Sequence, residues 1–167
     1  MKYIRRKIRQ HEYRVIQSYR ARIVTVNSKE VLCVLKILIV TNNRLVHETY
    51  GSSAACTVCS VKTCYVDGDV ESLLIKVRDM VHEGYPLLSH PLPASIRMIY
   101  SPYRSVMLGA ISGKLEPWHV KTIEDSLTKY RRSTGHRALD SASEAEYKWM
   151  DMQLLTTAMN EPLPFAE

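Results

Sequence analysis

One loop of the sequence gathers hydrogen-bonding and cationic side chains between two short apolar runs. It lies in the stretch SHPLPASIRMIYSPYR, residues 89–104. Its prolines exclude regular strand pairing and stiffen the chain, so that polar groups are held in fixed directions with little ordering cost on binding. An arginine in such a loop can meet a carboxylate or a phosphate with two parallel hydrogen bonds. The loop is therefore a candidate site for a small anionic or amide-bearing ligand, and its candidate residues are His90, Ser95, Arg97, Ser101, Tyr103 and Arg104. The alternative is a loop in which His90 binds backbone groups and Arg97 is solvated.

A second polar group, Thr41, Asn42 and Asn43, directly follows the apolar run LKILIV. Ligands of open α/β sheets collect outside the carboxyl ends of the strands, where helix N-termini present unpaired N–H groups. We expect these three side chains to face a ligand at the same edge as the loop. The alternative is that the asparagines only cap the next helix, since Asn is favoured at such turns for conformational reasons.

Catalysis at this edge would depend on His90, because histidine is the side chain that changes charge most readily near neutral pH. No carboxylate lies near it in the sequence, and no Gly-x-Ser-x-Gly elbow exposes Ser89 as a nucleophile. Glycine-rich dinucleotide and phosphate-binding motifs are also missing, so we predict no cofactor. A small enzyme that uses His90 as acid or base on an amino-acid-like substrate, with Asn42 or Asn43 polarising a carbonyl, is the alternative function.

Three cysteines, Cys56, Cys59 and Cys64, lie within nine residues. A Cys-x-x-Cys pair is a zinc half-site or a redox dithiol in other proteins. Along a strand, however, Cys59 and Cys64 are separated by an odd interval and point to opposite faces. We therefore favour ordinary apolar packing for these thiols and predict no metal site, with zinc binding and redox chemistry as the alternatives.

Hydrophobic periodicity predicts strands and helices that alternate along the chain. Residues 69–83 carry apolar side chains at helical spacing, with Asp69 as the N-cap and Gly84 just past the end. The run at 35–43 is typical of a strand buried on both faces. We predict an α/β fold in β-α-β-α-β-β-α order, a small open, mostly parallel sheet with helices packed on it. The predicted strands are 35–43, 58–66, 85–89 and 103–111, and the predicted helices are 44–50, 69–83 and 115–132, the last facing the sheet with Trp118, Ile123, Leu127 and Tyr130.

Charge and composition divide the chain into three predicted parts. Residues 1–30 hold nine Lys/Arg and two acidic residues, whereas the rest holds fourteen and fifteen. We predict a basic N-terminal extension over 1–30 that forms an amphipathic helix or is disordered, an α/β domain over 31–135, and a C-terminal helical tail over 136–167. The tail would begin at a capping box, Ser-x-x-Glu, and bury a stripe formed by Tyr147, Met150, Leu154 and Met159.

The choice of partner follows from the same features. A nucleic acid would contact the basic extension, through Arg5, Arg6, Lys7 and Arg9, but the extension lacks an aromatic stacking platform, so we do not expect nucleic acid as the main partner. The sequence has no run of 18 apolar residues, which argues against a membrane partner. With four cysteines and no disulfide framework, we expect a cytoplasmic protein.

Several of these segments resemble the GrdX-type proteins. The resemblance is carried by ILIVTNN at 37–43, LLIKVRDMVHEGYPLLSHPLPASI at 73–96 and SPYRSVML at 101–108, and it covers roughly residues 35–132. Genes for such proteins lie beside those for the glycine, sarcosine and betaine reductases of amino-acid-fermenting anaerobes. The resemblance thus implies a role in that system, with reductase components as possible partners, but no particular reaction. The Cys-rich segment, the first thirty residues and the C-terminal tail lie outside the pattern.

The function predicted from the sequence is therefore a non-catalytic accessory or ligand-binding protein of the glycine, sarcosine and betaine reductase system. Its polar site would lie at the carboxyl edge of the strands and accept a small amino-acid-like ligand or a reductase component.

Overall fold

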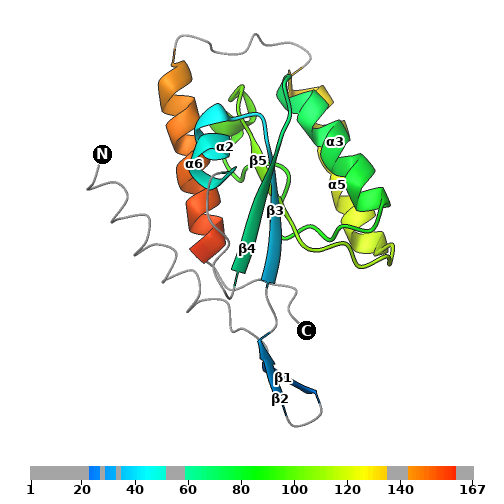
Figure 1. The fold of residues 1–167 in the computed structure, drawn as a ribbon. Coiled ribbons are helices and arrows are strands. Elements are labelled where there is room, and N and C mark those ends of the chain that lie inside the picture. Colours follow the sequence, from blue (N-terminus) through cyan, green and yellow to red (C-terminus); the bar gives the residue numbers. More distant parts are fainter. Residues whose placement is uncertain (1–22, 27–28, 33–34, 52–58, 135–142, 161–167) are drawn as a thin grey trace, which may run out of the picture.

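The structure is a computed structural model that describes residues 23–26, 29–32, 35–51, 59–134 and 143–160 (Figure 1). Strands and helices alternate over most of this range, as the sequence predicts. The strands are β1 (Ile23–Val26), β2 (Lys29–Leu32), β3 (Leu35–Thr41), β4 (Cys59–Tyr65) and β5 (Ser105–Leu108), and the helices are α2 (Arg44–Gly51), α3 (Val70–His82), α4 (Ile96–Ile99), α5 (Pro117–Thr134) and α6 (Glu144–Asn160).

A three-stranded sheet in the order β4-β3-β5 forms the centre of the fold. β3 pairs in parallel with β4 and antiparallel with β5, so the sheet is mixed, and the prediction of a mostly parallel sheet holds for only one of its two pairings. The predicted strand at 85–89 is reduced to a bridge between Leu87 and Leu108. The physical reason is Pro86, which has no N–H to contribute to a ladder.

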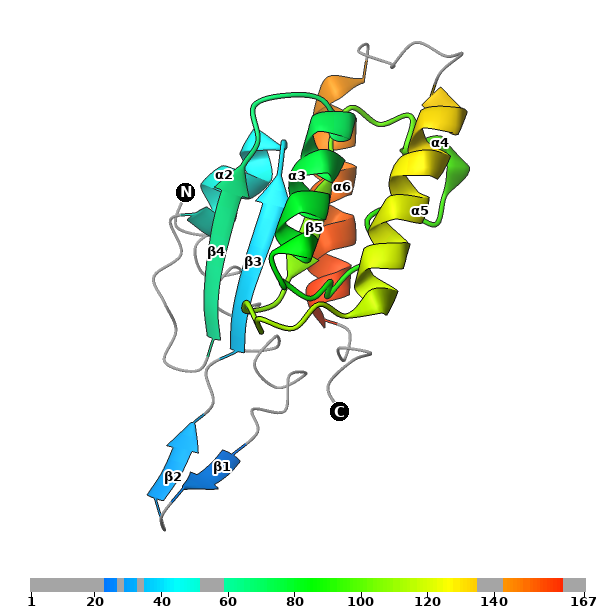
Figure 2. The same ribbon diagram turned by 90° about the vertical axis from the view of Figure 1, so that its right-hand side faces the viewer.

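Helices cover both faces of this sheet (Figure 2). Side chains of β3 and β5 alternate between the two faces, since Val40 and Val106 join the core with α3 and α5, whereas Ile39 and Met107 join the core with α2 and α6. β3 lies between two neighbouring strands and between two helical layers. This explains why its apolar side chains form a nearly continuous run.

The helix α3 has the boundaries that its sequence predicts. Asp69 caps its N-terminus by accepting hydrogen bonds at Oδ1 from the backbone N–H and the hydroxyl of Ser72, at 2.8 and 2.6 Å. These bonds favour the ionised carboxylate and lower the pKa of Asp69. The apolar face of the helix is buried, and its buried residues are Val70, Leu73, Leu74, Val77, Met80 and Val81.

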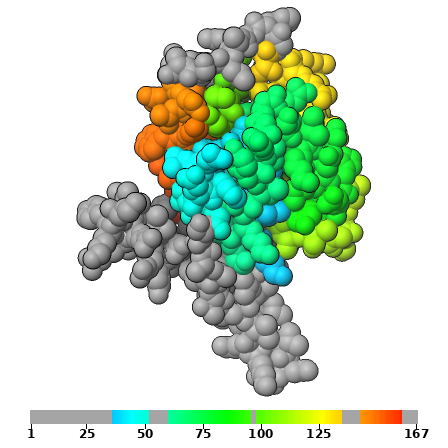
Figure 3. Space-filling view, turned by 45° about the horizontal axis from the view of Figure 1, so that its top comes forward, coloured from blue at the N-terminus to red at the C-terminus, as the bar shows by residue number. Residues whose placement is uncertain are grey.

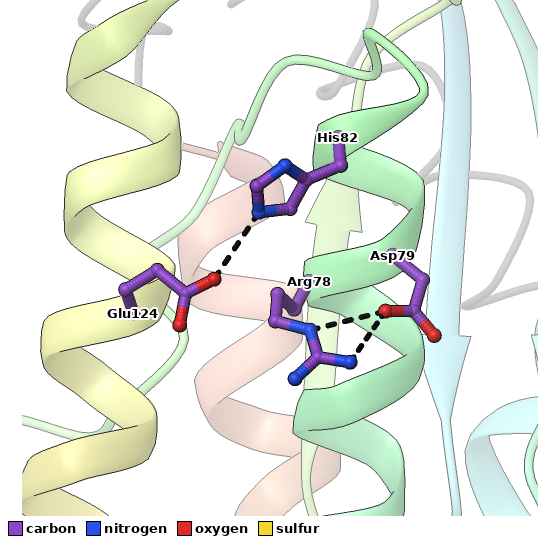
Figure 4. Close-up of polar contacts among 4 residues, drawn as sticks. All are labelled: Arg78, Asp79, His82 and Glu124. Atoms are coloured by element: carbon purple, nitrogen blue, oxygen red, sulfur yellow. Dashed lines mark hydrogen bonds and ion pairs between the residues drawn. The ribbon is translucent and has the colours of Figure 1, made fainter.

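Polar side chains also link α3 to its neighbour α5 (Figure 4). His82 points across to Glu124, with 3.1 Å between Nε2 and Oε1, while Arg78 forms a fork on Asp79 of its own helix. All four side chains are substantially exposed to solvent, and such pairs contribute little to stability. The two helices are therefore held together mainly by their apolar contacts with the core.

Two helices differ from prediction in the face that they bury. In α5, Ile123, Leu127 and Tyr130 are buried as predicted. The prediction is wrong for Trp118, which is 61% exposed, and His119 is buried in its place. In α6 the predicted stripe is wrong for Met150 and Leu154, which are exposed. The buried side of α6 is formed by Asp151, Leu155 and Met159, at intervals of four residues.

The first strands that the structure describes, β1 and β2, form a hairpin. β1 and β2 pair antiparallel, with Ile23 opposite Leu32 and Val26 opposite Lys29. The prediction that residues 1–30 form a helix or are disordered is therefore wrong for these strands, whose β-branched residues favour extended backbone. The basic residues 5–9 lie outside the described residues. Of the helices that the structure describes, none combines the length and apolar character that a membrane span needs.

Replacing Gly84 with Ala should destabilise the fold measurably. Gly84 has φ of 96°, a conformation that L side chains rarely adopt, and an added Cβ would lie 3.2 Å from the backbone nitrogen of Gly113. We expect a loss of about 2 kcal/mol in the free energy of unfolding, measured by urea titration. Gly113→Ala is the control, since Gly113 also has positive φ but no atom within 4 Å of an added Cβ. Equal losses in both variants would show that the close contact has no effect.

Candidate functional site

The end of β3 and the start of β5 lie side by side at one edge of the sheet. The antiparallel register places Thr41 opposite Ser105, and their hydroxyl oxygens are 2.8 Å apart. The backbone N–H of Asn42 donates to the carbonyl of Arg104 at 3.3 Å. The structure thus brings Thr41–Asn43 together with the last residues of the proline-containing loop, although about sixty residues separate them along the chain.

Asn42 connects three segments of the chain at this edge. Its Oδ1 accepts from the backbone N–H of Arg104 at 2.8 Å, and its Nδ2 donates to the carbonyls of Gly68 and Pro102 at 3.1 and 2.9 Å. The side chain is 5% exposed. The amide therefore holds the loops after β4 and before β5 against the end of β3.

Asn43 makes the corresponding connection to the C-terminal helix. Its Oδ1 accepts from the backbone N–H of Leu45 in the first turn of α2 at 3.1 Å, as in a helix cap. Its Nδ2 donates to the carbonyl of Lys148 at 2.8 Å and to Oδ2 of Asp151 at 3.0 Å. Asn43 therefore caps the helix α2, as the alternative to ligand binding predicted, and it also connects α2 to α6.

Asp151 is a site residue that sequence reasoning missed. Its side chain is 1% exposed, and Oδ2 accepts from Ser105 Oγ at 2.7 Å as well as from Asn43. Burial raises the pKa of the Asp151 carboxyl, while Arg104 and the two hydrogen bonds act in the opposite direction. The available signal was its spacing, because Asp151 lies four and eight residues before the buried Leu155 and Met159.

Arg104 is the cation of the site and is 5% exposed. Its Nη2 donates to the carbonyl of Met98 in α4 at 2.8 Å, but Nε is buried without a hydrogen-bond partner. Burial lowers the pKa of Arg104, and Asp151 and Tyr130 oppose this effect. A buried N–H group without a hydrogen-bond partner costs free energy. An acceptor that reached Nε of Arg104 would recover this cost and would therefore bind there favourably.

The outer loop residues make local contacts. His90 is exposed, and its Nδ1 is within hydrogen-bond distance of both the carbonyl and the N–H of Leu92, at 2.9 and 3.1 Å. Ser95 is exposed, and its carbonyl accepts from the N–H of Met98. Arg97 lies in α4, and the structure describes its backbone but not its side chain.

Ser101 and Tyr103 lie beside Arg104. The buried hydroxyl of Ser101 donates to the carbonyl of Tyr103 at 3.2 Å and accepts from its N–H. The hydroxyl of Tyr103 donates to Glu144 at the start of α6, and Lys148 Nζ lies 5.0 Å from the centre of the Tyr103 ring. Burial and the bond to Glu144 raise the pKa of Tyr103.

The structure bears on the metal and thiol alternatives only through its described residues. Within the described residues, no group of three His, Cys, Asp or Glu side chains is arranged to hold a metal ion. Cys64 is partly buried and packs against the core beside α3. Cys33 and Cys56 lie outside the described residues, as does the side chain of Cys59.

The fold and this edge define a small mixed α/β protein in which buried polar side chains join the end of one strand to the start of another. The family model described as GrdX-like protein matches residues 38–160, and the chain belongs to this family. The match includes β4 and α6, so the expectation that the Cys-rich segment and the C-terminal tail lie outside the family pattern is wrong for these elements. No curated protein and no solved structure matches this chain significantly.

Proposed function

We propose that this chain is a non-catalytic accessory protein of the glycine, sarcosine and betaine reductase system. It acts by binding a small amino-acid-like ligand, or a segment of a reductase component, at the edge where β3 ends and β5 begins. Membership of the GrdX-like family supports the reductase context. The buried Arg104 with its unpartnered Nε is the observation that supports binding at this edge.

The residues of the edge divide into a frame and a contact surface in this proposal. Thr41, Asn42, Asn43 and Ser101 form the frame, because their side chains are hydrogen-bonded to other parts of the chain. Arg104 supplies the charge that attracts a ligand. A carboxylate that reached its guanidinium would replace the Met98 carbonyl and accept from Nε and Nη2 together, in the two-pronged geometry that carboxylates favour.

Access to Arg104 would require movement of the segment that covers it. The carbonyl that now binds Nη2 belongs to α4, a helix of only four residues within a loop. Loops on a rigid scaffold are the usual place for recognition, since they move at lower cost than strands or long helices. His90 and Ser95, which are exposed on the same loop, would contact a larger ligand such as a peptide segment.

Enzymatic function has less support. The Leu92 carbonyl can orient the His90 ring, but neither hydrogen bond of this ring among the described residues involves a carboxylate or a nucleophilic side chain. Binding of nucleic acid would depend on the basic residues 5–9, which lie outside the description.

Replacing Arg104 with Met should weaken ligand binding at least tenfold. Isothermal titration with glycine, sarcosine, betaine and purified reductase components measures this effect, because the variant removes the cation but keeps most of the buried volume. Arg104→Lys, which keeps the charge and loses the fork, should give an intermediate affinity. Arg78→Met, at a partly exposed position on α3, is the control and should bind as the wild type does. The proposal fails if no member of the panel binds, or if Arg104→Met binds with unchanged affinity while its melting curve shows a folded protein.

A further inference from the structure

The outer edge of β4 is an open strand edge in the part of the chain that the structure describes. The sheet order places β4 at one side, next to β3 alone. The other side is covered, since the N–H of Leu88 donates to the carbonyl of Met107 and the N–H of Gly109 donates to the carbonyl of Pro86. In Figure 3, the part of the chain that contains β4 is visible at the surface between α2 and α3.

The register identifies the backbone groups that face outward. The N–H of Val66 donates to the carbonyl of Thr41, which shows that even-numbered residues of this strand turn their backbone groups toward β3. Because the direction alternates along a strand, Val61, Thr63 and Tyr65 turn their N–H and C=O groups away from the sheet. No hydrogen bond to these outward groups is found among the described residues.

This row of groups is complementary to itself. In an antiparallel pair, two opposed residues of the hydrogen-bonded type exchange both of their N–H···O bonds. Two copies of β4 related by a two-fold axis at Thr63 would place Thr63 opposite its own copy, and Val61 opposite Tyr65 of the second copy. All three outward residues of each copy would then be satisfied.

The side chains favour this register over its neighbour. With the axis at Thr63, a β-branched residue lies opposite an aromatic residue, and Lys62 lies opposite the uncharged Cys64 of the second copy. A shift of the axis to Lys62 would place two lysines directly opposite each other, and like charges in that position are destabilising. The exposed Lys62 thus disfavours the register centred on Lys62 relative to the one centred on Thr63.

We propose that the outer edge of β4 is the interface of a symmetric homodimer, in which two three-stranded sheets join into one continuous sheet through antiparallel pairing centred on Thr63. A second copy fits this edge because its donors and acceptors match under two-fold symmetry without placing the two Lys62 side chains opposite each other. Two-fold symmetry is the commonest symmetry of soluble oligomers. The contact surface of one strand edge is small compared with that of permanent dimers, so the dimer forms at high micromolar rather than nanomolar concentrations.

Thr63→Pro tests the interface in the full-length protein by sedimentation equilibrium up to about 500 µM, a range that suits a small interface. Proline removes an N–H that points outward, so it deletes two bonds across the symmetric pair and leaves the bonds to β3 in place. We expect a concentration-dependent dimer for the wild type and a monomer for Thr63→Pro. A wild type that stays monomeric over the whole range, or a folded Thr63→Pro that dimerises as the wild type does, would overturn the proposal.

Cross-linking tests the register independently, in case Thr63→Pro does not fold. In a variant with all four native cysteines replaced by Ser, Thr63→Cys should form a disulfide-linked dimer on mild oxidation, because Cα atoms of a hydrogen-bonded antiparallel pair are about 5.5 Å apart. Lys62→Cys in the same background is the control, and it should cross-link at least tenfold more slowly, because its copy is displaced along the strand. Equal cross-linking at the two positions, or none at Thr63, would contradict the proposed pairing.

Discussion

Asn42→Asp should lower the free energy of unfolding by about 4 kcal/mol at neutral pH, the largest loss that we expect from a single substitution at the site. Asn42 is buried, and its Nδ2 donates to two backbone carbonyls, those of Gly68 and Pro102. Aspartate has nearly the same shape, but its carboxylate would place a buried negative charge against two acceptors. Chemical denaturation followed by circular dichroism measures the loss.

Asn42→Ala provides the comparison that identifies the cause. Alanine leaves the same backbone groups without partners but adds no charge, so it should cost about 2 kcal/mol less than the aspartate variant at pH 7. The difference should shrink at acid pH, where a protonated carboxyl group can donate again. Equal losses for Ala and Asp at neutral pH would contradict the predicted cost of placing a buried negative charge against the carbonyls of Gly68 and Pro102.

Asp151→Ala should cost about 3 kcal/mol, because it leaves Asn43 Nδ2 and Ser105 Oγ without their shared acceptor in the interior. Asp151→Asn keeps an acceptor oxygen and should cost less. The unfolding free energy from urea titration measures both changes. An alanine variant as stable as the wild type would show that α6 does not depend on this carboxylate for its docking.

The same residue gives a pH dependence with a definite sign. Burial raises the pKa of the Asp151 carboxyl above its ordinary value, so between those two values the folded chain holds a proton that the unfolded chain has lost. Relative to Asp151→Asn, the wild type should therefore gain stability as the pH falls through the raised pKa toward the ordinary one, and lose it as the pH rises through the same interval. Parallel stability curves for the two proteins, or a relative loss on acidification, would contradict the raised pKa.

Local sequence patterns predicted β3 and α3 correctly, because the residues of each element reflect its own burial and capping. β3 is apolar and β-branched, and it lies between two strands, so its composition directly reflects burial on both faces. α3 carries its own cap at Asp69 and an uninterrupted apolar face. The strand predicted at 85–89 failed for a local reason, since Pro86 cannot donate to a ladder. The inward position predicted for Trp118 failed because it depends on neighbours that are distant in the sequence.

The sequence predicted that Thr41–Asn43 and the loop before β5 lie close together, but it did not predict the bonds between them. The loop reaches the end of β3 because β3 and β5 are antiparallel, a pairing that the prediction of a mostly parallel sheet did not specify. Residue types alone do not show which acceptor an asparagine amide binds, so the connections of Asn42 to Gly68 and Pro102 could not be read from the sequence. Asp151 was missed for a related reason, because a buried carboxylate in a helix resembles a solvated one until its partners are known.

Hydrogen exchange on the full-length protein, with and without purified reductase components, tests the central claim most directly. The amides of residues 90–105 include those that cover Arg104, and binding at this edge should slow their exchange. The account predicts strong protection in this segment when a component is present, and its loss in Arg104→Met. Protection confined to the exposed surface of α3 and α5, or no change anywhere at saturating concentrations of every component, would contradict it.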